Sequence, residues 1–259
     1  MNLCLAFNTK SGFIYRDFGC MKKIFGILIL VLILQGCRSA MLYTSNNIPI
    51  PLMHEVRETQ IAVEYGMNGT NINIVASPLE NVALSFSGIT NKISEKSNVS
   101  EDGYQDENSH NYSEIAVGYY SKINEKYIAE FYTGYGRGSG RDQNFVNYFL
   151  GNKIHSNLSE GKFDKYFLQA NFGSREKNLT IGFALRFSYL NFYQLIKEND
   201  GVLIFPSKKE GLFVEPALFA RFGGKNIMLE LQFLFPYAQK DIDFDYRGII
   251  ISTGLRFIF

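Results

Sequence analysis

The sequence predicts an all-β protein, a ten-stranded antiparallel up-and-down transmembrane β-barrel. Aromatic content is high, with 23 Phe and 16 Tyr in 259 residues, and these residue types favour strands. Apolar residues alternate with polar or small ones along most of the chain, which is typical of strands whose two faces meet different surroundings. Short and long connections also alternate, as in outer-membrane barrels with short periplasmic turns and long outer loops.

Composition excludes several other classes of protein. A formal net charge of +1 gives no basis for binding nucleic acid, so we expect no nucleic-acid partner. With 46% apolar residues the chain is too hydrophobic to remain disordered. It contains no apolar run of about 18 residues, so a membrane-spanning helix is not expected either.

Residues 21–36 have the layout of an export signal. Two lysines follow Met21, and an apolar core covers residues 24–34. A core of about 11 residues suits a signal peptide and is too short for a spanning helix, which needs about 20. The core ends in Leu34-Gln35-Gly36-Cys37, which resembles the lipobox of bacterial lipoproteins and predicts lipid attachment to Cys37. The alternative is a general secretory signal followed by an unrelated cysteine.

The remaining boundaries follow from this signal. Residues 1–20 contain Arg16 and Asp17 and fit no export signal, so we expect translation to start at Met21 and residues 1–20 to be an artefactual extension. The mature chain then consists of a lipidated leader, residues 37–55, and a barrel, residues 56–259. Of the 3 cysteines only Cys37 remains in it, which excludes a disulfide or a thiolate metal site within one monomer.

The first two predicted strands, residues 56–67 and 70–77, form a hairpin. Apolar residues are odd-numbered in the first strand and even-numbered in the second. A two-residue loop joins positions of opposite parity, and Asn68-Gly69 suits a type I′ turn because both residues tolerate positive φ. The sequence therefore predicts a tight turn here.

The next five strands cover residues 81–93, 111–122, 126–139, 162–175 and 178–194. Their apolar faces alternate with a mixed face that combines charges with small residues such as Gly118 and Gly134. The turn at residues 176–177 is tight, whereas residues 94–110 and 140–161 are expected to be long loops.

The last three strands cover residues 211–222, 225–237 and 246–259. They follow a long loop at residues 195–210, and Gly223-Gly224 forms the turn between the first two of them. Pro216 lies within a strand of a barrel that has no edges, so we expect a β-bulge there.

The apolar face of the strands is predicted to face lipid. It is large and continuous, whereas the mixed face carries many glycines. Glycines weaken a solvent-exposed strand, but in a narrow lumen they make room for long side chains. The alternative is a soluble β-sandwich or a lipocalin-like barrel with the apolar face inside.

Several segments together point to one family. They are the lipobox, Ile48-Pro49-Ile50-Pro51 in the leader, the strand Tyr132 to Gly138, the hairpin Phe213 to Asn226, and the aromatic end Leu255 to Phe259. With them the mature chain resembles the small outer-membrane β-barrel lipoproteins of Gram-negative bacteria. The resemblance implies a location in the bacterial outer membrane, contact with outer-membrane lipid and lipopolysaccharide, and recognition by the barrel-assembly machinery through the strand ending at Phe259. It implies no activity, cofactor or metal, and it identifies no surface ligand.

Charged residues on the mixed face form the candidate site. They are expected to fill the lumen as a network of ion pairs, because barrels of about 8 strands leave room only for side chains and open porins have about 16. The network residues are Glu58, Glu64, Glu114, Glu130, Lys165, Arg186, Glu215, Arg221, Glu230 and Arg256. Closure brings the first strand beside the last, so we expect Glu58 to pair with Arg256 and Gln60 to lie nearby.

The sequence therefore predicts an outer-membrane lipoprotein with a charge-plugged lumen and a structural or surface-interaction role. One alternative is a small pore or passive transporter. The other is a hydrolase of lipids or peptides at the outer rim, since His110 lies near Asp106 and Glu107. No second half of such a site is evident, so we predict no catalytic residue and no enzyme activity.

Overall fold

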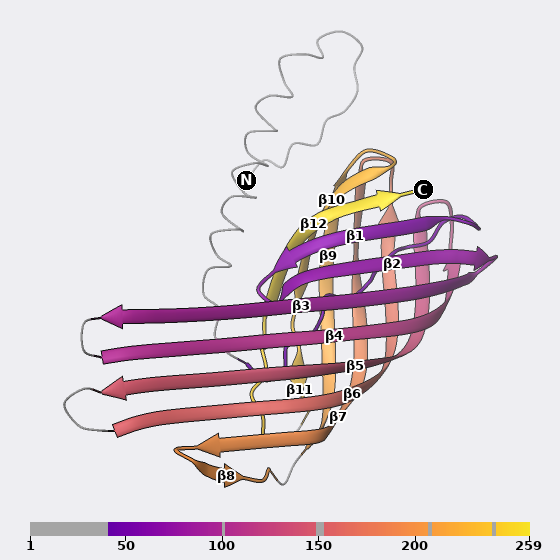
Figure 1. The fold of residues 1–259 in the computed structure, drawn as a ribbon. Coiled ribbons are helices and arrows are strands. Elements are labelled where there is room, and N and C mark those ends of the chain that lie inside the picture. The colour runs from indigo at the N-terminus through magenta and orange to yellow at the C-terminus, as the bar shows by residue number, and fades with distance from the viewer. Residues whose placement is uncertain (1–40, 100–101, 149–152, 207–208, 240–241) are drawn as a thin grey trace, which may run out of the picture. The chain divides into compact units, whose positions relative to one another are not determined.

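The barrel wall consists of ten long antiparallel strands (Figure 1). The computed structural model describes residues 41–99, 102–148, 153–206, 209–239 and 242–259. The ten strands are β1 (Thr59–Gly66), β2 (Gly69–Leu79), β3 (Val82–Val99), β4 (Asp102–Lys122), β5 (Tyr127–Tyr148), β6 (Lys153–Arg175), β7 (Leu179–Asn199), β9 (Glu210–Gly223), β10 (Ile227–Leu234) and β12 (Ile250–Ile258). Two short strands, β8 (Val202–Ile204) and β11 (Tyr237–Ala238), pair with β7 and β9. Within the described residues, no helix is long and apolar enough to cross a bilayer.

The wall closes on itself. β1 pairs with β12, and β9 pairs with β7, so the long strands form a continuous ring. Closure leaves no edge strand whose backbone groups would meet lipid unpaired. The predicted fold class, an antiparallel ten-stranded barrel, is confirmed.

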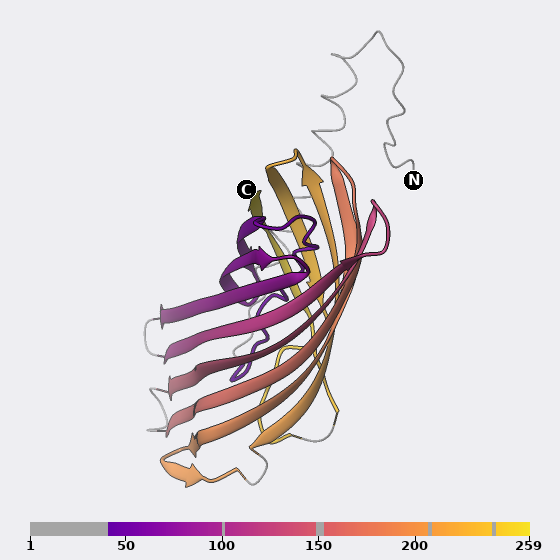
Figure 2. The ribbon, with the colours of Figure 1, turned by 90° about the vertical axis from the view of Figure 1, so that its right-hand side faces the viewer.

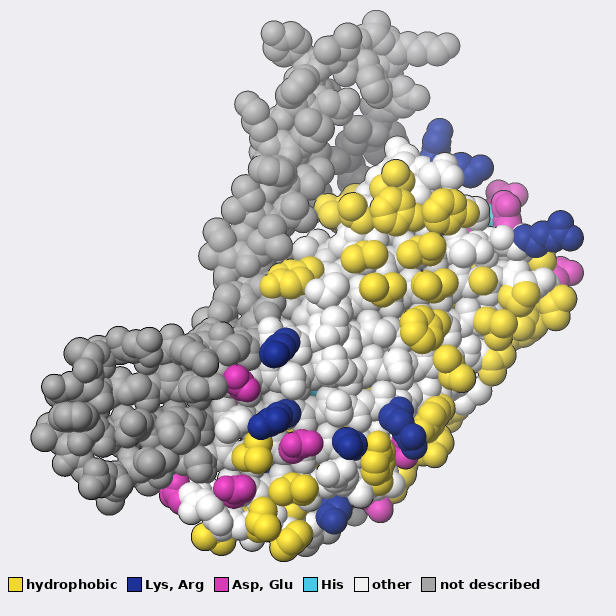
Figure 3. Space-filling model, in the orientation of Figure 1, with side chains coloured by type: hydrophobic (Ala, Val, Ile, Leu, Met, Phe, Trp, Pro, Cys, Tyr) yellow, Lys and Arg dark blue, Asp and Glu magenta, His cyan; other side chains and the backbone are white. Residues whose placement is uncertain are grey.

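The outside of the barrel is apolar and the lumen is polar. On β5, for example, Phe131 is 65% exposed, whereas its neighbours Glu130 and Tyr132 are 0% and 5% exposed. In Figure 3 apolar side chains gather over one part of the wall, and charged ones lie on either side of that part. A bilayer requires this arrangement, because lipid contacts only the outer face of each strand.

Two hairpins continue beyond the barrel as paired strands. β3 stays paired with β4, and β5 with β6, up to the last described residues of each hairpin. The predicted loops over residues 94–110 and 140–161 are therefore wrong, and most of residues 195–210 also belong to strands. Apolar alternation stops where strands leave the bilayer, because both faces then meet polar surroundings. These extensions consequently have the composition of loops.

The predicted turns at Asn68-Gly69 and Gly223-Gly224 keep the parity of their flanking strands but use other residues. Gly66 pairs with Gly69, so the first turn consists of Met67 and Asn68, and Gly69 adopts a φ of 111°. Gly223 pairs with Met228 and the Gly224 N–H donates to the Ile227 carbonyl at 2.9 Å, so the turn between β9 and β10 consists of Lys225 and Asn226. The lipid-facing residues are unaffected, because each pairing moves by an even number of positions.

Pro216 lies in a regular part of β9, so the predicted bulge is wrong. Its neighbours pair in unbroken register with β7 and β10, and its carbonyl accepts a hydrogen bond from the Phe235 N–H at 2.9 Å. The missing N–H would point to the same side, toward Phe235 just beyond the end of β10 at Leu234, so the proline removes at most one ladder bond, at the end of that strand pair. A register shift lies instead in β2, around Pro78.

Candidate functional site: a lumen filled by the leader

Residues 41–55, called the leader below, pass through the lumen. Figure 2 shows this segment, in indigo, on the concave side of the wall. Residues 42–53 are buried, and Ile50, Leu52 and Met53 are 0% exposed. Sequence analysis expected a leader here but did not predict that it fills the barrel.

Side chains of the wall bind the main chain of the leader. The Gln232 amide accepts a hydrogen bond from the Ile48 N–H at 3.0 Å and donates one to the Ile48 carbonyl at 2.9 Å. Similar bonds join Asn68 to the carbonyl of Ser45, Gln169 to that of Pro49, Arg221 to that of Ile50, Gln60 to that of Pro51, Arg175 to that of Leu52, and Glu130 to the N–H of Met53. Pro49 and Pro51 suit this path, because each lacks an N–H that the lumen would have to satisfy. The wall thus fixes the path of the leader largely through its backbone.

Apolar side chains of the leader fill the remaining space. Ile48, Ile50 and Leu52 form one buried cluster with wall residues that include Phe219 and Leu234. Full burial of each aliphatic side chain contributes about 1.5–3 kcal/mol. Polar and apolar contacts therefore both hold the leader in place.

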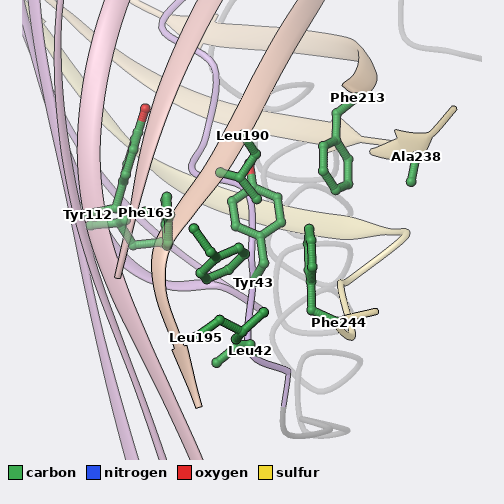
Figure 4. Close-up of a cluster of buried hydrophobic side chains, with 11 residues drawn as sticks. Leu42, Tyr43, Tyr112, Phe163, Leu190, Leu195, Phe213, Ala238 and Phe244 are labelled. Carbon is green, nitrogen blue, oxygen red and sulfur yellow. The ribbon is translucent and has the colours of Figure 1, made fainter. Parts of the chain in front are cut away.

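An aromatic cluster surrounds Tyr43 at the end of the lumen that the long hairpins form (Figure 4). The Tyr43 ring centroid lies 5.4 Å from that of Phe163 and 5.1 Å from that of Phe213. Phe244, from the connection between β11 and β12, packs on the same cluster, with 6.3 Å between its ring centroid and that of Phe213. These rings close this end of the lumen around the leader.

Glu215 binds both the leader and the wall. Its carboxylate accepts hydrogen bonds from Tyr43 at 3.4 Å and from Ser45, both in the leader. From the wall, Ser188 donates at 2.5 Å and the Lys165 ammonium lies at 3.0 Å. A carboxylate and an ammonium group removed from water need such compensation.

Arg186 reaches across the lumen to Glu114. Its Nη1 and Nη2 atoms donate to the two carboxylate oxygens of Glu114 at 3.0 and 2.9 Å. Gln169 accepts further bonds from Nε and Nη2 at 3.0 and 2.7 Å, and the Phe167 ring lies 4.0 Å from the guanidinium carbon. This buried bidentate pair is the geometry in which an ion pair is strongest.

A third charged group lies near β1, β9, β10 and β12. Glu230 pairs with Arg221 at 3.1 Å and with Arg256 at 2.7 Å. Glu64 lies 3.8 Å from Arg256 and accepts a hydrogen bond from Asn47 of the leader at 2.5 Å. The leader therefore contacts this group through Asn47, just as Asn46 accepts a hydrogen bond from Arg186 at 3.4 Å and Ser45 donates one to Glu215.

The predicted pair of Glu58 with Arg256 is wrong. β1 and β12 are neighbours as predicted, but Arg256 lies opposite Ala62, so Glu58 lies farther along the strand, by about 13 Å at about 3.3 Å per residue. Gln60 connects the two, donating to Glu58 at 2.5 Å and accepting from Arg256 at 3.1 Å. Arg175, 2.7 Å from Glu58, is its ionic partner. Sequence analysis missed Arg175 because it adjoins a turn, although it has the parity of the lumen-facing residues of β6.

Glycines make room for large side chains in the lumen. A Cβ atom at Gly136 would lie 2.1 Å from the Tyr112 hydroxyl oxygen, and one at Gly118 would lie 2.3 Å from the Tyr132 ring. The mixed face thus carries small residues opposite large ones, which is the crowding expected of a narrow barrel.

The described histidines lie apart from each other. His110 is buried and stacks on Phe163 with 6.0 Å between ring centroids. His54 lies in the leader near the tight turns, 3.7 Å from Glu55. Among the described residues, no group of three or more His, Cys, Asp or Glu could hold a metal ion. Cys37 and the predicted signal at residues 21–36 lie outside the described residues.

Comparison with known proteins finds similarity of fold alone. No protein-family model and no curated protein matches the chain. The outer membrane protease OmpT from Escherichia coli is similar with a TM-score of 0.46 and 11% identity, covering 78% of this chain and 92% of that one. The translocator domain of autotransporter NalP from Neisseria meningitidis has a TM-score of 0.42 and 9% identity, covering 94% and 98%. CarO from Acinetobacter baumannii has a TM-score of 0.34 and 11% identity, covering 78% and 97%.

The architecture itself defines the class of protein. A closed antiparallel wall, an apolar outer surface and a polar lumen are the features of an outer-membrane β-barrel. The chain is such a barrel, and the predicted location in the bacterial outer membrane is confirmed.

Proposed function

We propose that this outer-membrane barrel has a structural or surface-interaction role and that its own leader keeps the lumen closed. The observation that carries the proposal is the burial of residues 42–53 among the side chains of the wall. Barrels of about 8 strands are filled by their own side chains, and two additional strands widen the lumen only modestly. Here an extended peptide and an ion-pair network together occupy that space.

Conductance across planar bilayers tests the closed lumen. The full chain should give no steady open current. The triple variant Ile48→Asp, Ile50→Asp, Leu52→Asp should give currents, because three carboxylates cannot remain in an apolar cluster. Val56→Asp is the matched control, since Val56 is exposed just beyond the leader, and it should stay silent. Steady open currents from the unmodified chain would instead support a small pore.

The proposal includes lipid attachment to Cys37, which the lipobox motif supports. Cys37→Ala should abolish labelling by a palmitate analogue while leaving the barrel able to insert, because the strands supply their own affinity for the membrane. Heat-modifiable gel mobility reports insertion independently of the label. Persistent labelling of the variant would refute the assignment of Cys37.

The partners that we propose are outer-membrane lipid and lipopolysaccharide. On the outside of the wall, Tyr135 and Tyr166 lie 5.1 Å apart between ring centroids, and Arg137, two residues along β5 on the same face, pairs with Asp164 at 2.8 Å. A groove of about 400 Å³ beside them is lined by Arg137, Lys162 and Tyr193, among others. Aromatic rings mark the membrane interface of such barrels, and adjacent cations suit phosphate headgroups. Phe259, exposed at the end of the chain, supports recognition by the barrel-assembly machinery.

A further inference from the structure

The leader runs through the barrel in one direction, which the contacts along β6 define. At the tight-turn end of the barrel, Arg175 donates to the Leu52 carbonyl at 2.9 Å. At the other end, the Tyr43 ring packs on Phe163. Beyond it, Asn108 of β4 donates to the Met41 carbonyl at 3.4 Å. The leader therefore passes from the hairpin end at Met41 to the tight-turn end, where β1 begins.

The length of the leader matches the thickness of a membrane. From Phe163 to Arg175 the strand β6 covers about 40 Å, or about 30 Å along the barrel axis for a tilt of about 40°. From Tyr43 to Leu52 an extended chain covers about 30 Å at about 3.3 Å per residue. The hydrocarbon layer of a bilayer is also about 30 Å thick. The leader thus makes one complete crossing in an extended form.

The tight turns identify the periplasmic end. The turns after β2, β4, β6 and β9 share this end with Phe259, whose N–H donates to the Thr59 carbonyl at 2.9 Å. Short turns face the periplasm in outer-membrane barrels, so the hairpins that extend β3 to β6 face outward. Glu55 and Val56, where the leader joins the wall, consequently lie on the periplasmic side.

The other end of the leader lies beyond the rim of the barrel wall at β1 and β2. Asn68, in the turn between these strands, donates to the Ser45 carbonyl at 3.0 Å, so Ser45 is level with that rim. Residues 41–44 lie farther out, where the Tyr43 N–H donates to the Asp245 carbonyl at 3.1 Å. Asp245 belongs to the outer connection that precedes β12.

We infer that the chain crosses the outer membrane through its own lumen and delivers the segment before Met41 to the cell surface. The barrel then serves as the passage for its own N-terminal region. Cys37 is four residues from Met41 and so within about 14 Å of it along the chain. Lipid on Cys37 would therefore enter the outer leaflet from outside and anchor the chain a second time. The path rests on the leader contacts, and only the lipid rests on the proposed function.

An epitope inserted between Ser39 and Ala40 of the full chain tests this path. On intact cells an antibody should detect it as strongly as the same epitope inserted in the hairpin between β3 and β4. The matched control carries the epitope between Glu55 and Val56, the opposite end of the leader, and should be detected only after the outer membrane is permeabilised. Detection of the epitope at residues 39–40 only after permeabilisation would overturn the inference.

A second measurement needs no insertion. Trypsin added to intact cells should cleave after Arg38, giving a new N-terminus at Ser39 by mass spectrometry, and should spare the exposed Arg57 at the tight-turn end. Cleavage after Arg57 but not after Arg38 would reverse the assigned direction. Heat-modifiable mobility confirms in each case that the barrel is folded, and palmitate labelling reports the lipid separately, so failure of the path and failure of lipidation are distinguishable.

Discussion

Removing the guanidinium of Arg186 should cost more stability than removing any exposed charge. In Arg186→Met, Glu114 stays buried without the two hydrogen bonds that it accepts at 3.0 and 2.9 Å. An uncompensated buried charge costs about 3–5 kcal/mol, and Glu114→Gln should cost a similar amount by leaving Arg186 unpaired. The double variant leaves no unpaired charge. It loses the hydrogen bonds between the two residues, at about 1–2 kcal/mol, and those from Arg186 to Gln169, which the single variant Arg186→Met loses as well and which therefore cancel in the cycle. The coupling energy of the pair should therefore be about 4 kcal/mol or more.

Urea unfolding in detergent, followed by heat-modifiable gel mobility, measures the free energy of unfolding of all four proteins in this cycle. Lys126 and Glu176 provide the matched control, an ion pair between two tight turns with side chains 48% and 51% exposed. The hydrogen bond to Glu176, and the attraction of its charge, raise the pKa of Lys126 above its ordinary value. Water screens this pair, so its cycle should give a coupling energy close to zero.

The comparison between the two cycles shows whether the charges in the lumen are shielded from water. A coupling energy for Arg186 and Glu114 that is no larger than that of the control would show that water reaches the lumen charges. That result would refute the argument that the leader and the ion pairs exclude water from the lumen.

Three further substitutions test other contacts, each by urea unfolding. Ile50→Ala should cost about 2–5 kcal/mol because it opens a cavity in the leader cluster, whereas Val56→Ala, at an exposed position, should change stability by less than about 0.5 kcal/mol. Gln232→Leu should cost about 2–4 kcal/mol by leaving the Ile48 N–H and carbonyl unsatisfied, and a cost below about 1 kcal/mol would mean that water replaces the amide. Gly118→Val should prevent folding because its side chain meets the Tyr132 ring, whereas Gly88→Ala, whose Cβ would have no neighbour closer than 3.9 Å, should fold normally.

The sequence by itself determined the barrel and its lipid-facing surface. A bilayer requires apolar and polar residues to alternate along every strand. Whether Phe131 or Glu130 faces lipid or the lumen therefore follows from the strand's own sequence, whichever strand it pairs with. Local geometry also determines which positions pair across a turn. The predicted parity was therefore correct even where the observed turn lies one or two residues from the predicted one. The pairing of β1 with β12 follows from closure of the barrel alone.

Pairing within the lumen depended on the tertiary structure. Side chains there meet across the barrel, so the partner of Glu58 depends on the register of β1 with β12 and on the reach of Arg175 from β6. The residues around Glu58 in the sequence indicate neither this register nor the contact with Arg175. The hairpins beyond the membrane were also hidden, because strands that meet water on both faces lose the alternation that identifies them.

The path of the leader was decided only by the complete fold. Its one alternation, Ile48, Ile50 and Leu52 separated by Pro49 and Pro51, is short and rich in proline, so the segment resembles an exposed linker and not a strand. Its backbone groups find partners on β2, β5, β6, β9 and β10, and hence only after the wall has assembled around it. An extended segment has no hydrogen bonds of its own, so the surroundings that satisfy them determine where it lies.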